Sequence, residues 1–396
     1  MKMTRIALAI AATAVVSTPA LATNGDNLIG LGAHSRAMGG TGTAMFMGSE
    51  NALTNPGLLG KSQGTEFAIG GTLFKPDVKS KNLSVGKEFT SGNDTNIIPE
   101  VSLSTRLSNN LTFGLGIFGS AGMGVDYQDT ATTDGLAKGY SNLQLMKFAP
   151  TLAYNTDKFG IGFAPVLQYG ALDINFDNGA QSFGHGMSSD LGMGYNLGGY
   201  FDVMKNLTIG VSYQSPIDMK YKGVLNGTNG AGSKFGLTNL TDHLEQPAEL
   251  KAGIAYGMGA YSVTADYKQI AWGSAKGYKD FNWKDQNVFA LGGKYQGNGY
   301  WAGVGYNYGD DPIKENKAGT SAATSINYLN NVFFPGIVTT HFTFGGGVKV
   351  SKNMAIDGAV VYAPAVNKTV NQGVTNYGIK TTHSQMGYTV SLRMNF

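Results

Sequence analysis

The alternation of apolar and polar residues is the feature that most restricts how this chain can fold. In the last segment Tyr388, Val390 and Leu392 alternate with polar residues, and the segment after Leu207 repeats the pattern. A period of two places successive side chains on opposite faces of a β-strand. No apolar run after the first residues approaches the roughly 18 residues that a transmembrane helix needs. The chain is therefore expected to be built from strands.

We predict an all-β fold, a 14-stranded antiparallel transmembrane β-barrel. The strands are expected at residues 65–78, 95–108, 110–119, 140–155, 158–176, 190–204, 206–222, 247–257, 259–270, 286–297, 299–309, 337–351, 353–366 and 382–396. Tight turns follow the even-numbered strands, and longer polar loops follow the odd-numbered ones. This sorting is typical of outer-membrane barrels, whose short turns face the periplasm. The turns of a soluble β-sandwich would not sort in this way.

The composition agrees with a membrane barrel. The chain has 58 Gly, 20 Tyr and 20 Phe, and only 14% of its residues are charged. This composition has too many aromatic residues for a disordered chain and too few charged residues for an ordinary soluble surface. The balance of 29 basic against 26 acidic residues also gives no sign of a nucleic-acid partner.

Residues 1–22 have the pattern of a signal peptide. Lys2 and Arg5 precede an apolar run, and Ala20 to Ala22 provide a small-residue cleavage site. We expect the mature chain to begin at Thr23 and to reach the bacterial outer membrane. The chain has no Cys, which excludes a lipid anchor and structural disulfides.

Residues 23–64 differ from the rest of the chain. They are rich in Gly and small residues and show neither an alternating strand nor a long amphipathic helix. We expect them to form a hatch that plugs the lumen of a barrel made by residues 65–396.

Short motifs in the hatch resemble the FadL family (OMPP1/FadL/TodX) of outer-membrane transporters of long-chain fatty acids and other hydrophobic compounds. The residues that carry this resemblance are Ser35, Arg36, Gly39, Gly40, Asn55 and Pro56. Similar family features recur at residues 246–253, 265–272, 306–312 and 334–341. The chain departs from the family at Gly57, where Ala is usual, so the detailed conformation of the hatch is less firmly implied than the barrel.

The resemblance implies a transport mechanism. Substrate would be captured by the extracellular loops, pass to an apolar pocket above the hatch, and leave sideways where the third strand is kinked inward. The glycines expected at this kink are Gly114, Gly116, Gly119 and Gly122. Glycine permits a bend or bulge in a strand, but these glycines would equally provide packing room against the hatch.

Substrate-binding candidates combine one cation with apolar walls. Lys147 is the preferred partner for a fatty-acid carboxylate. The apolar candidates are Leu28, Ile29, Met45, Phe46, Phe118 and Tyr169. Strand alternation also turns Glu249, Lys251, Asp266, Lys268, Lys294, Lys349, Asp357 and Arg393 towards the lumen, where most are expected to pair with one another or with the hatch. Where the family has an arginine in the fifth strand, this chain has Gln168 and Tyr169, which tilts the expected substrate slightly towards neutral or aromatic compounds.

Other functions are less well supported by the sequence. No third group is placed to orient His341 or His383 as a catalytic base, no nucleotide loop lies in a βαβ context, and no metal-ligand spacing is present. We expect no catalysis, cofactor or metal. The expected partners are a hydrophobic small molecule, outer-membrane lipid and lipopolysaccharide, and the barrel-assembly machinery, with the channel itself a monomer. The alternatives are a channel for neutral aromatic hydrocarbons and a structural barrel or adhesin, whose lumen would lack a detergent-sized apolar pocket.

Overall fold

The computed structural model describes residues 24–184, 186–226, 230–234, 237, 240–317, 320–372 and 377–396. The predicted signal peptide, residues 1–22, and the predicted mature terminus, Thr23, lie outside the described residues.

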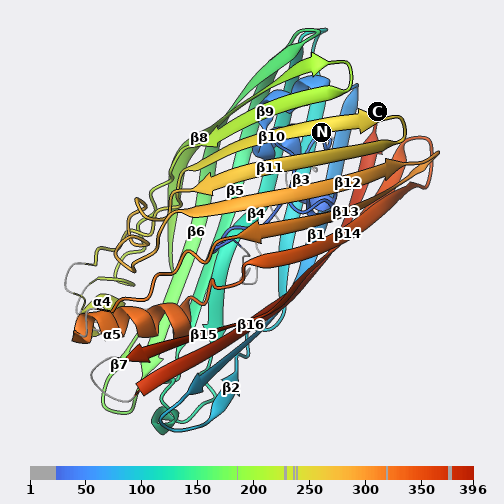
Figure 1. Cartoon of the computed structure of the whole chain (residues 1–396). Helices are drawn as coiled ribbons and strands as arrows, with labels where there is room; N and C mark the ends of the chain where they lie inside the picture. The colour runs from blue at the N-terminus through green and yellow to red at the C-terminus, as the bar shows by residue number, and fades with distance from the viewer. Residues whose placement is uncertain are drawn as a thin grey trace, which may run out of the picture.

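Fourteen long antiparallel strands form a closed barrel, as predicted (Figure 1). Each pairs with the next along the chain, and β1 pairs with β16 to close the ring. The barrel strands are β1 (Thr65–Asn82), β3 (Asn96–Arg106), β4 (Leu111–Asp126), β5 (Tyr140–Asn155), β6 (Phe159–Asp177), β8 (Ser188–Met204), β9 (Leu207–Gln214), β10 (Glu249–Met258), β11 (Tyr261–Ile270), β12 (Gln286–Gln296), β13 (Tyr300–Gly309), β14 (Thr340–Lys349), β15 (Met354–Gln372) and β16 (Tyr377–Asn395). Two short strands, β2 (Glu88–Thr90) and β7 (Ser182–Phe183), lie beside them and were not predicted.

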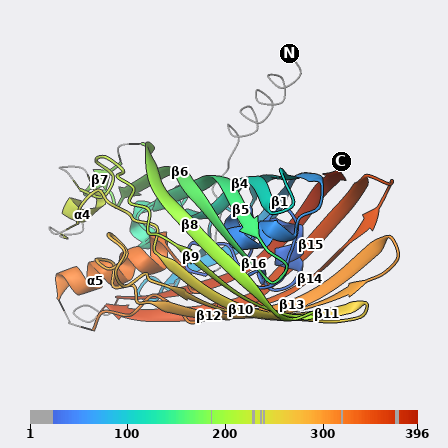
Figure 2. The ribbon, with the colours of Figure 1, turned by 90° about the horizontal axis from the view of Figure 1, so that it is seen from above.

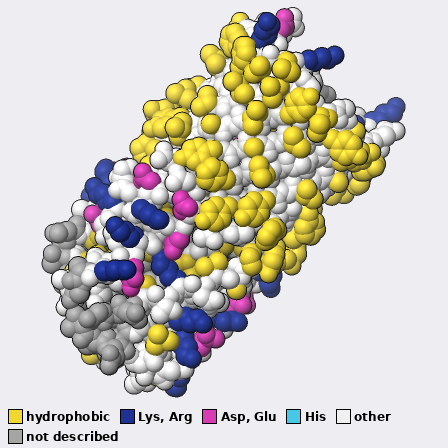
Figure 3. Space-filling model, viewed as in Figure 1, with side chains coloured by type: hydrophobic (Ala, Val, Ile, Leu, Met, Phe, Trp, Pro, Cys, Tyr) yellow, Lys and Arg dark blue, Asp and Glu magenta, His cyan; other side chains and the backbone are white. Residues whose placement is uncertain are grey.

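The barrel wall has an apolar outer face. Along β6, Ile161 and Phe163 are exposed, whereas Gly162 and Ala164 between and after them are buried. Figure 3 shows the resulting band of hydrophobic side chains on the face of the wall in view. This is the pattern of a wall that contacts hydrocarbon outside and packs against an occupied lumen inside. No helix in the described part of the chain is long and apolar enough to cross a membrane.

The two ends of the barrel differ in the length of their connections, as the sequence predicted. Short turns join β3 to β4, β5 to β6, β8 to β9, β10 to β11, β12 to β13 and β14 to β15. The long loops at the other end carry η2 (Thr132–Asp134), α4 (Ala231–Lys234), α5 (Ser321–Tyr328) and η3 (Leu329–Phe333). Several predicted strand ends are corrected: β1 continues to Asn82 instead of 78, β15 continues to Gln372 instead of 366, and β16 begins at Tyr377 instead of 382. β9 stops at Gln214 instead of 222, because Pro216 cannot donate to a strand ladder, and β4 continues to Asp126 instead of 119.

Residues 24–64 lie inside the barrel and contain α2 (Gly32–Ala37), α3 (Asn51–Thr54) and η1 (Pro56–Lys61) (Figure 2). Asn55 explains the Asn-Pro motif of this hatch. Its side chain accepts a hydrogen bond from the Gly57 amide and donates to the carbonyl oxygens of Thr43 (2.6 Å) and Gly199 (3.0 Å). Pro56 begins η1, where a missing N–H costs nothing. The motif therefore caps η1 and attaches it to β8.

The Ser-Arg and Gly-Gly motif also attaches the hatch to the wall. Arg36 donates to Glu100 of β3 at 2.7 Å. The Gly39 amide donates to Thr343 of β14 at 2.8 Å, in a left-handed conformation (φ 71°) that suits glycine. Ser35 and Gly40 close the turn after α2, because the Ser35 carbonyl accepts from the Gly40 amide at 2.8 Å. The hatch is thus fixed to β3 and β14 as well as to β8.

Candidate functional site

The first residues of the hatch add to an edge of β4. Asn27 forms an isolated bridge with Ala121, the Leu28 amide donates to Ser120, and the Gly122 amide donates to the carbonyl of Asp26. The Asp26 carboxyl group accepts from two residues of the long loops, Tyr278 and Gln246. This segment therefore connects the hatch, the wall and the extracellular loops. We call it the N-terminal clamp, residues 24–28.

The clamp can reach β4 because β3 and β4 separate there. Their last registered pair is Glu100 with Phe118, and beyond it β3 pairs only with β1. The pairing of β4 with β5 also shifts register between Gly119 and Ala121. Nearer the long loops, the Gly92 amide donates to the carbonyl of Asp126 at 2.8 Å. We call the interrupted seam between these two points the β3–β4 break.

The four predicted kink glycines divide between two roles. Gly119 borders the register shift and Gly122 donates to the clamp, so both lie at the break. Gly114 and Gly116 are in regular pairing with β3, and the prediction that they form the kink is corrected. A methyl group on Gly114 would clash with Leu59 of the hatch. These two glycines provide packing room inside the wall.

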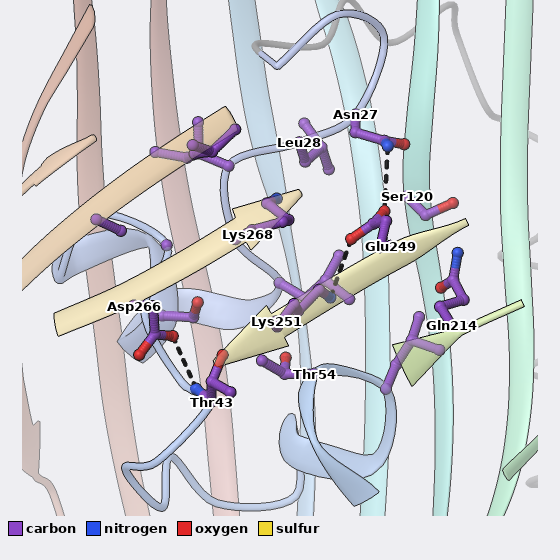
Figure 4. Close-up of a pocket in the computed structure, with 18 of the residues that line it drawn as sticks. Asn27, Leu28, Thr43, Thr54, Ser120, Gln214, Glu249, Lys251, Asp266 and Lys268 are labelled. Atoms are coloured by element: carbon purple, nitrogen blue, oxygen red, sulfur yellow. Dashed lines mark hydrogen bonds and ion pairs between the residues drawn. The ribbon is translucent and has the colours of Figure 1, made fainter. Parts of the chain in front are cut away.

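A cavity of about 60 Å³ lies between the hatch and β5, β9, β10 and β11 (Figure 4). It is lined on the hatch side by Leu28 and Ile29 and on the wall side by charged residues. The cavity has room for a few water molecules or a small polar group, not for a long acyl chain. The charged residues of its wall are Lys147, Glu249, Lys251, Asp266 and Lys268.

The acidic groups of this wall already have partners. The Asp266 carboxylate accepts from the Gly42 and Thr43 amides of the hatch, at 2.9 and 2.8 Å. Glu249 accepts from Asn27 at 3.1 Å and pairs with Lys251 at 3.1 Å. Both carboxylates therefore hold the hatch in place.

Two of the three ammonium groups are less well satisfied. Lys147 is 3% exposed and donates to a neutral amide oxygen, that of Gln214, at 3.0 Å. Among the described residues, Lys268 has neither a hydrogen-bond acceptor nor an ion-pair partner within 4.0 Å. A buried ammonium group needs an anion or several hydrogen bonds to offset its lost hydration. The cavity is therefore electrostatically suited to an anion.

The structure brings only some of the predicted binding residues together. Lys147, Leu28 and Ile29 line the cavity. Phe118 is buried beside the break, and Met45 and Phe46 are half-buried in the hatch; none of these three is among the lining residues. Tyr169 is corrected. It lies on the outer face of β6 and is 39% exposed, while its neighbour Gln168 points inward and is fully buried.

Lys251 and Lys268 were recognised as lumen-facing from strand alternation but not as part of a binding site. Alternation gives the direction of a side chain along its own strand. It does not show which strands surround the same part of the hatch. Lys147 of β5, Lys251 of β10 and Lys268 of β11 line one cavity because these three strands do so.

An apolar core fills the barrel between this cavity and the extracellular loops. Trp272 packs against Tyr278 and Trp283, with ring centroids 4.6 and 5.1 Å apart. Leu28 of the clamp belongs to the same buried cluster, as do Phe281 and Phe334. Two larger apolar hollows, of about 670 and 530 Å³, lie among lipid-facing side chains of the outer wall. The apolar lumen is thus occupied by loop aromatics in this conformation.

Comparison with known proteins gives consistent matches. Residues 9–396 match the family described as outer membrane protein transport protein (OMPP1/FadL/TodX). A long-chain fatty acid transport protein of Escherichia coli is 25% identical, over 80% of this chain and 84% of that one. A shorter match, 46% identical over 68 residues, is to an uncharacterised Chlorobium limicola protein, of which the chain spans 34%. The crystal structure of the Pseudomonas putida toluene transporter TodX superposes with a TM-score of 0.69, at 20% identity, covering 93% of this chain and 99% of that one.

Proposed function

Because the chain belongs to the OMPP1/FadL/TodX family of outer-membrane transport proteins, we propose that it takes up long-chain fatty acids and releases them sideways into the outer membrane. Family membership confirms the expected location in the outer membrane and a transport channel for hydrophobic compounds rather than an enzyme. The substrate, its binding residues and its exit route are our proposal.

The observation that carries the choice of substrate is a pair of ammonium groups beside the hatch, one buried (Lys147) and one half-buried (Lys268), that have no ion-pair partner within 4.0 Å among the described residues. Lys147 and Lys268 face a cavity whose two carboxylates are engaged by the hatch and by Lys251. A fatty-acid carboxylate would accept hydrogen bonds from these two ammonium groups, and charge-assisted hydrogen bonds are the strong ones in proteins. The size of the cavity fits the head group alone.

The acyl tail would occupy the apolar core above the cavity. Leu28 belongs to both the cavity wall and this core, so an apolar surface runs from one to the other. The tail enters by displacing loop aromatics such as Trp272 and Trp283, which pack on the backbone of the clamp at Gly25. Capture would therefore disturb the clamp as well as the loops.

We place the exit route at the β3–β4 break because the hatch closes the lumen below the cavity, whereas the strand pairing of the wall is interrupted at the break. The hatch is hydrogen-bonded to β3, β8, β11 and β14, which opposes passage straight down the lumen. On the inner side of the β3–β4 break, the clamp forms backbone hydrogen bonds with Ser120 and Gly122 of β4. Displacing the clamp opens the wall towards hydrocarbon, where an apolar tail gains free energy without crossing water.

Uptake assays with neutral lysine variants test the proposed substrate. In a strain lacking its own transporter, Lys147→Met and Lys268→Met should each weaken oleate uptake about tenfold or more, because a hydrogen bond to a charged group contributes roughly 1.5–3 kcal/mol. Lys294→Met, which removes a lumen lysine outside the cavity, is the matched control and should retain uptake. Unchanged oleate uptake by both cavity variants would exclude the carboxylate role.

Neutral aromatic hydrocarbons are the second candidate. The inward-facing Gln168 of β6 is uncharged, and its side-chain amide has no partner among the described residues. The aromatic core around Trp272 would also suit a ring, and the structurally similar TodX is a toluene transporter. This candidate predicts that toluene uptake is present and is insensitive to Lys147→Met, whereas oleate uptake is absent in the unmodified protein.

A further inference from the structure

The outer face of β1 changes character abruptly along its length. Ile69 and Leu73 are exposed apolar residues of the lipid-facing band. Two residues beyond Leu73, on the same face, Lys75 begins a ladder that continues through Asp77, Lys79 and Lys81 towards the long loops. At about 3.4 Å per residue, this ladder starts about 7 Å beyond Leu73 and ends about 27 Å beyond it along the strand.

The neighbouring strand adds a fourth lysine. Lys380 of β16 is flanked by the buried residues Ile379 and Thr381, so it points outward. It is the direct cross-strand partner of Lys81. Like charges directly opposite one another on a sheet are destabilising. Such a pair is expected to be retained where a negatively charged partner lies against it.

The acidic residues nearby do not neutralise this surface. Lys79 pairs with Asp77 at 3.3 Å, both partners being substantially exposed. Glu88 is next to Lys81 in register on β2. Among the described residues, no acidic side chain lies within 4.0 Å of the ammonium groups of Lys75, Lys81 or Lys380. Four lysines therefore face two carboxylates.

The position of this surface on the barrel is specific. In register, Leu73 pairs with Tyr388, and both are 41% exposed at the upper limit of the apolar band. Figure 3 shows that charged side chains of both signs replace the apolar band at the long-loop end. On the outer face of β6, the corresponding end carries Asp173 and Asp177 instead. At this level β1 and β16 thus carry basic side chains on their outer face where β6 carries acidic ones.

We propose that the outer face of β1 and β16 binds the phosphorylated head group of lipopolysaccharide, a glycolipid of the outer leaflet. The apolar residues below Leu73 contact its acyl chains, and the lysine ladder meets negative groups at successive heights above them. The repeated charge along the strand fits a head group with several anionic groups better than a phospholipid with one phosphate. Lipid phosphate attracts Lys near a membrane surface by a simple electrostatic effect.

Binding of purified lipopolysaccharide to the protein in detergent, with EDTA present to remove bridging cations, tests this proposal. Bound lipid is counted by native mass spectrometry over a concentration series. The variant Lys75→Gln/Lys81→Gln/Lys380→Gln should bind on the order of 100-fold more weakly, from three lost attractions. The control Lys158→Gln/Lys205→Gln/Lys352→Gln removes the same charge from exposed lysines in the short turns and should bind like the unmodified protein.

Two further ligands define the head group. Lipopolysaccharide from which the phosphates have been removed should bind poorly, and phosphatidylglycerol should bind much more weakly than lipopolysaccharide. The proposal is overturned if the ladder variant binds as tightly as the control, or if phosphatidylglycerol binds as tightly as lipopolysaccharide. Because binding is measured without substrate, the result is independent of the fatty-acid proposal.

Discussion

Arg36 of the hatch and Glu100 of β3 form a buried ion pair, with 2.7 Å between Nη1 and Oε2. Glu100 is also half of the last cross-strand pair before β3 and β4 separate. One residue therefore anchors the hatch and marks the edge of the β3–β4 break. The arrangement explains how the hatch can stay fixed while the wall next to it is interrupted.

The first prediction concerns the contribution of this ion pair to stability. Arg36→Met leaves the Glu100 carboxylate buried without its cation, and breaking a buried pair in this way costs roughly 3–5 kcal/mol. Urea unfolding in detergent micelles, followed by the fluorescence of the three tryptophans, should show that loss. The double variant Arg36→Met/Glu100→Met removes the unpaired charge and should recover much of the stability. Equal losses in the single and double variants would contradict the proposed anchoring role.

The second prediction separates packing glycines from glycines of the break. Gly114→Ala places a methyl group against Cδ1 of Leu59, and overpacking of this kind costs roughly 1–3 kcal/mol. Adding Leu59→Ala makes room for that methyl group, so Gly114→Ala should cost less in the Leu59→Ala background than in the unmodified protein. Unfolding free energies of the four proteins give this comparison. The packing role would be refuted if Gly114→Ala cost the same in both backgrounds.

The third prediction concerns pH and the N-terminal clamp. Burial raises the pKa of the Asp26 carboxyl group to about 6, although hydrogen bonds from Tyr278 and Gln246 act in the opposite direction. The folded state therefore holds this proton more tightly than the unfolded chain, where an aspartate has a pKa of about 3.9. The contribution to stability is complete below that pH and is lost as the pH rises towards about 6.

Asp26→Asn removes this titration and keeps the side chain neutral. Its free energy of unfolding should exceed that of the unmodified protein at pH 7, and the difference should shrink as the pH falls from about 6 to about 4. Urea titrations at several pH values measure the difference. A constant difference over this range would show that Asp26 is not the group responsible.

The sequence predicted those features that repeat along the chain. Alternation located Leu207, Ile209 and Val211 on the lipid-facing side of β9, and the order of short and long connections predicted a closed barrel. The same rule placed Lys147 inside. It would also have placed Tyr169 outside, because Tyr169 lies one residue from the inward-facing Gln168. Tyr169 was a candidate because its ring is apolar, whereas its position in the inward–outward alternation of β6 excludes it from the lumen.

The rest depends on contacts that no local pattern encodes. Asn27 meets Glu249 across 222 residues, and Gly39 meets Thr343 across 304. β4 extends to Asp126 because β5 pairs with it as far as Tyr140, while the clamp bonds Ser120 and Gly122 on the edge that β3 no longer occupies. Its glycines allowed either a kink or packing room, and only the position of the hatch distinguishes Gly114 from Gly119.

The lateral exit is the central proposal, and a reversible crosslink across the break tests it most directly. A Cβ atom on Gly119 would lie 2.7 Å from Cγ2 of Ile98, so the two Cβ atoms would be within about 4.2 Å, which suits a disulfide. The chain has no other cysteine. In Ile98→Cys/Gly119→Cys, oleate uptake should be lost on oxidation and restored by reduction, while each single variant remains insensitive to redox conditions. Normal uptake by the fully crosslinked protein would show that substrate does not leave through the β3–β4 break.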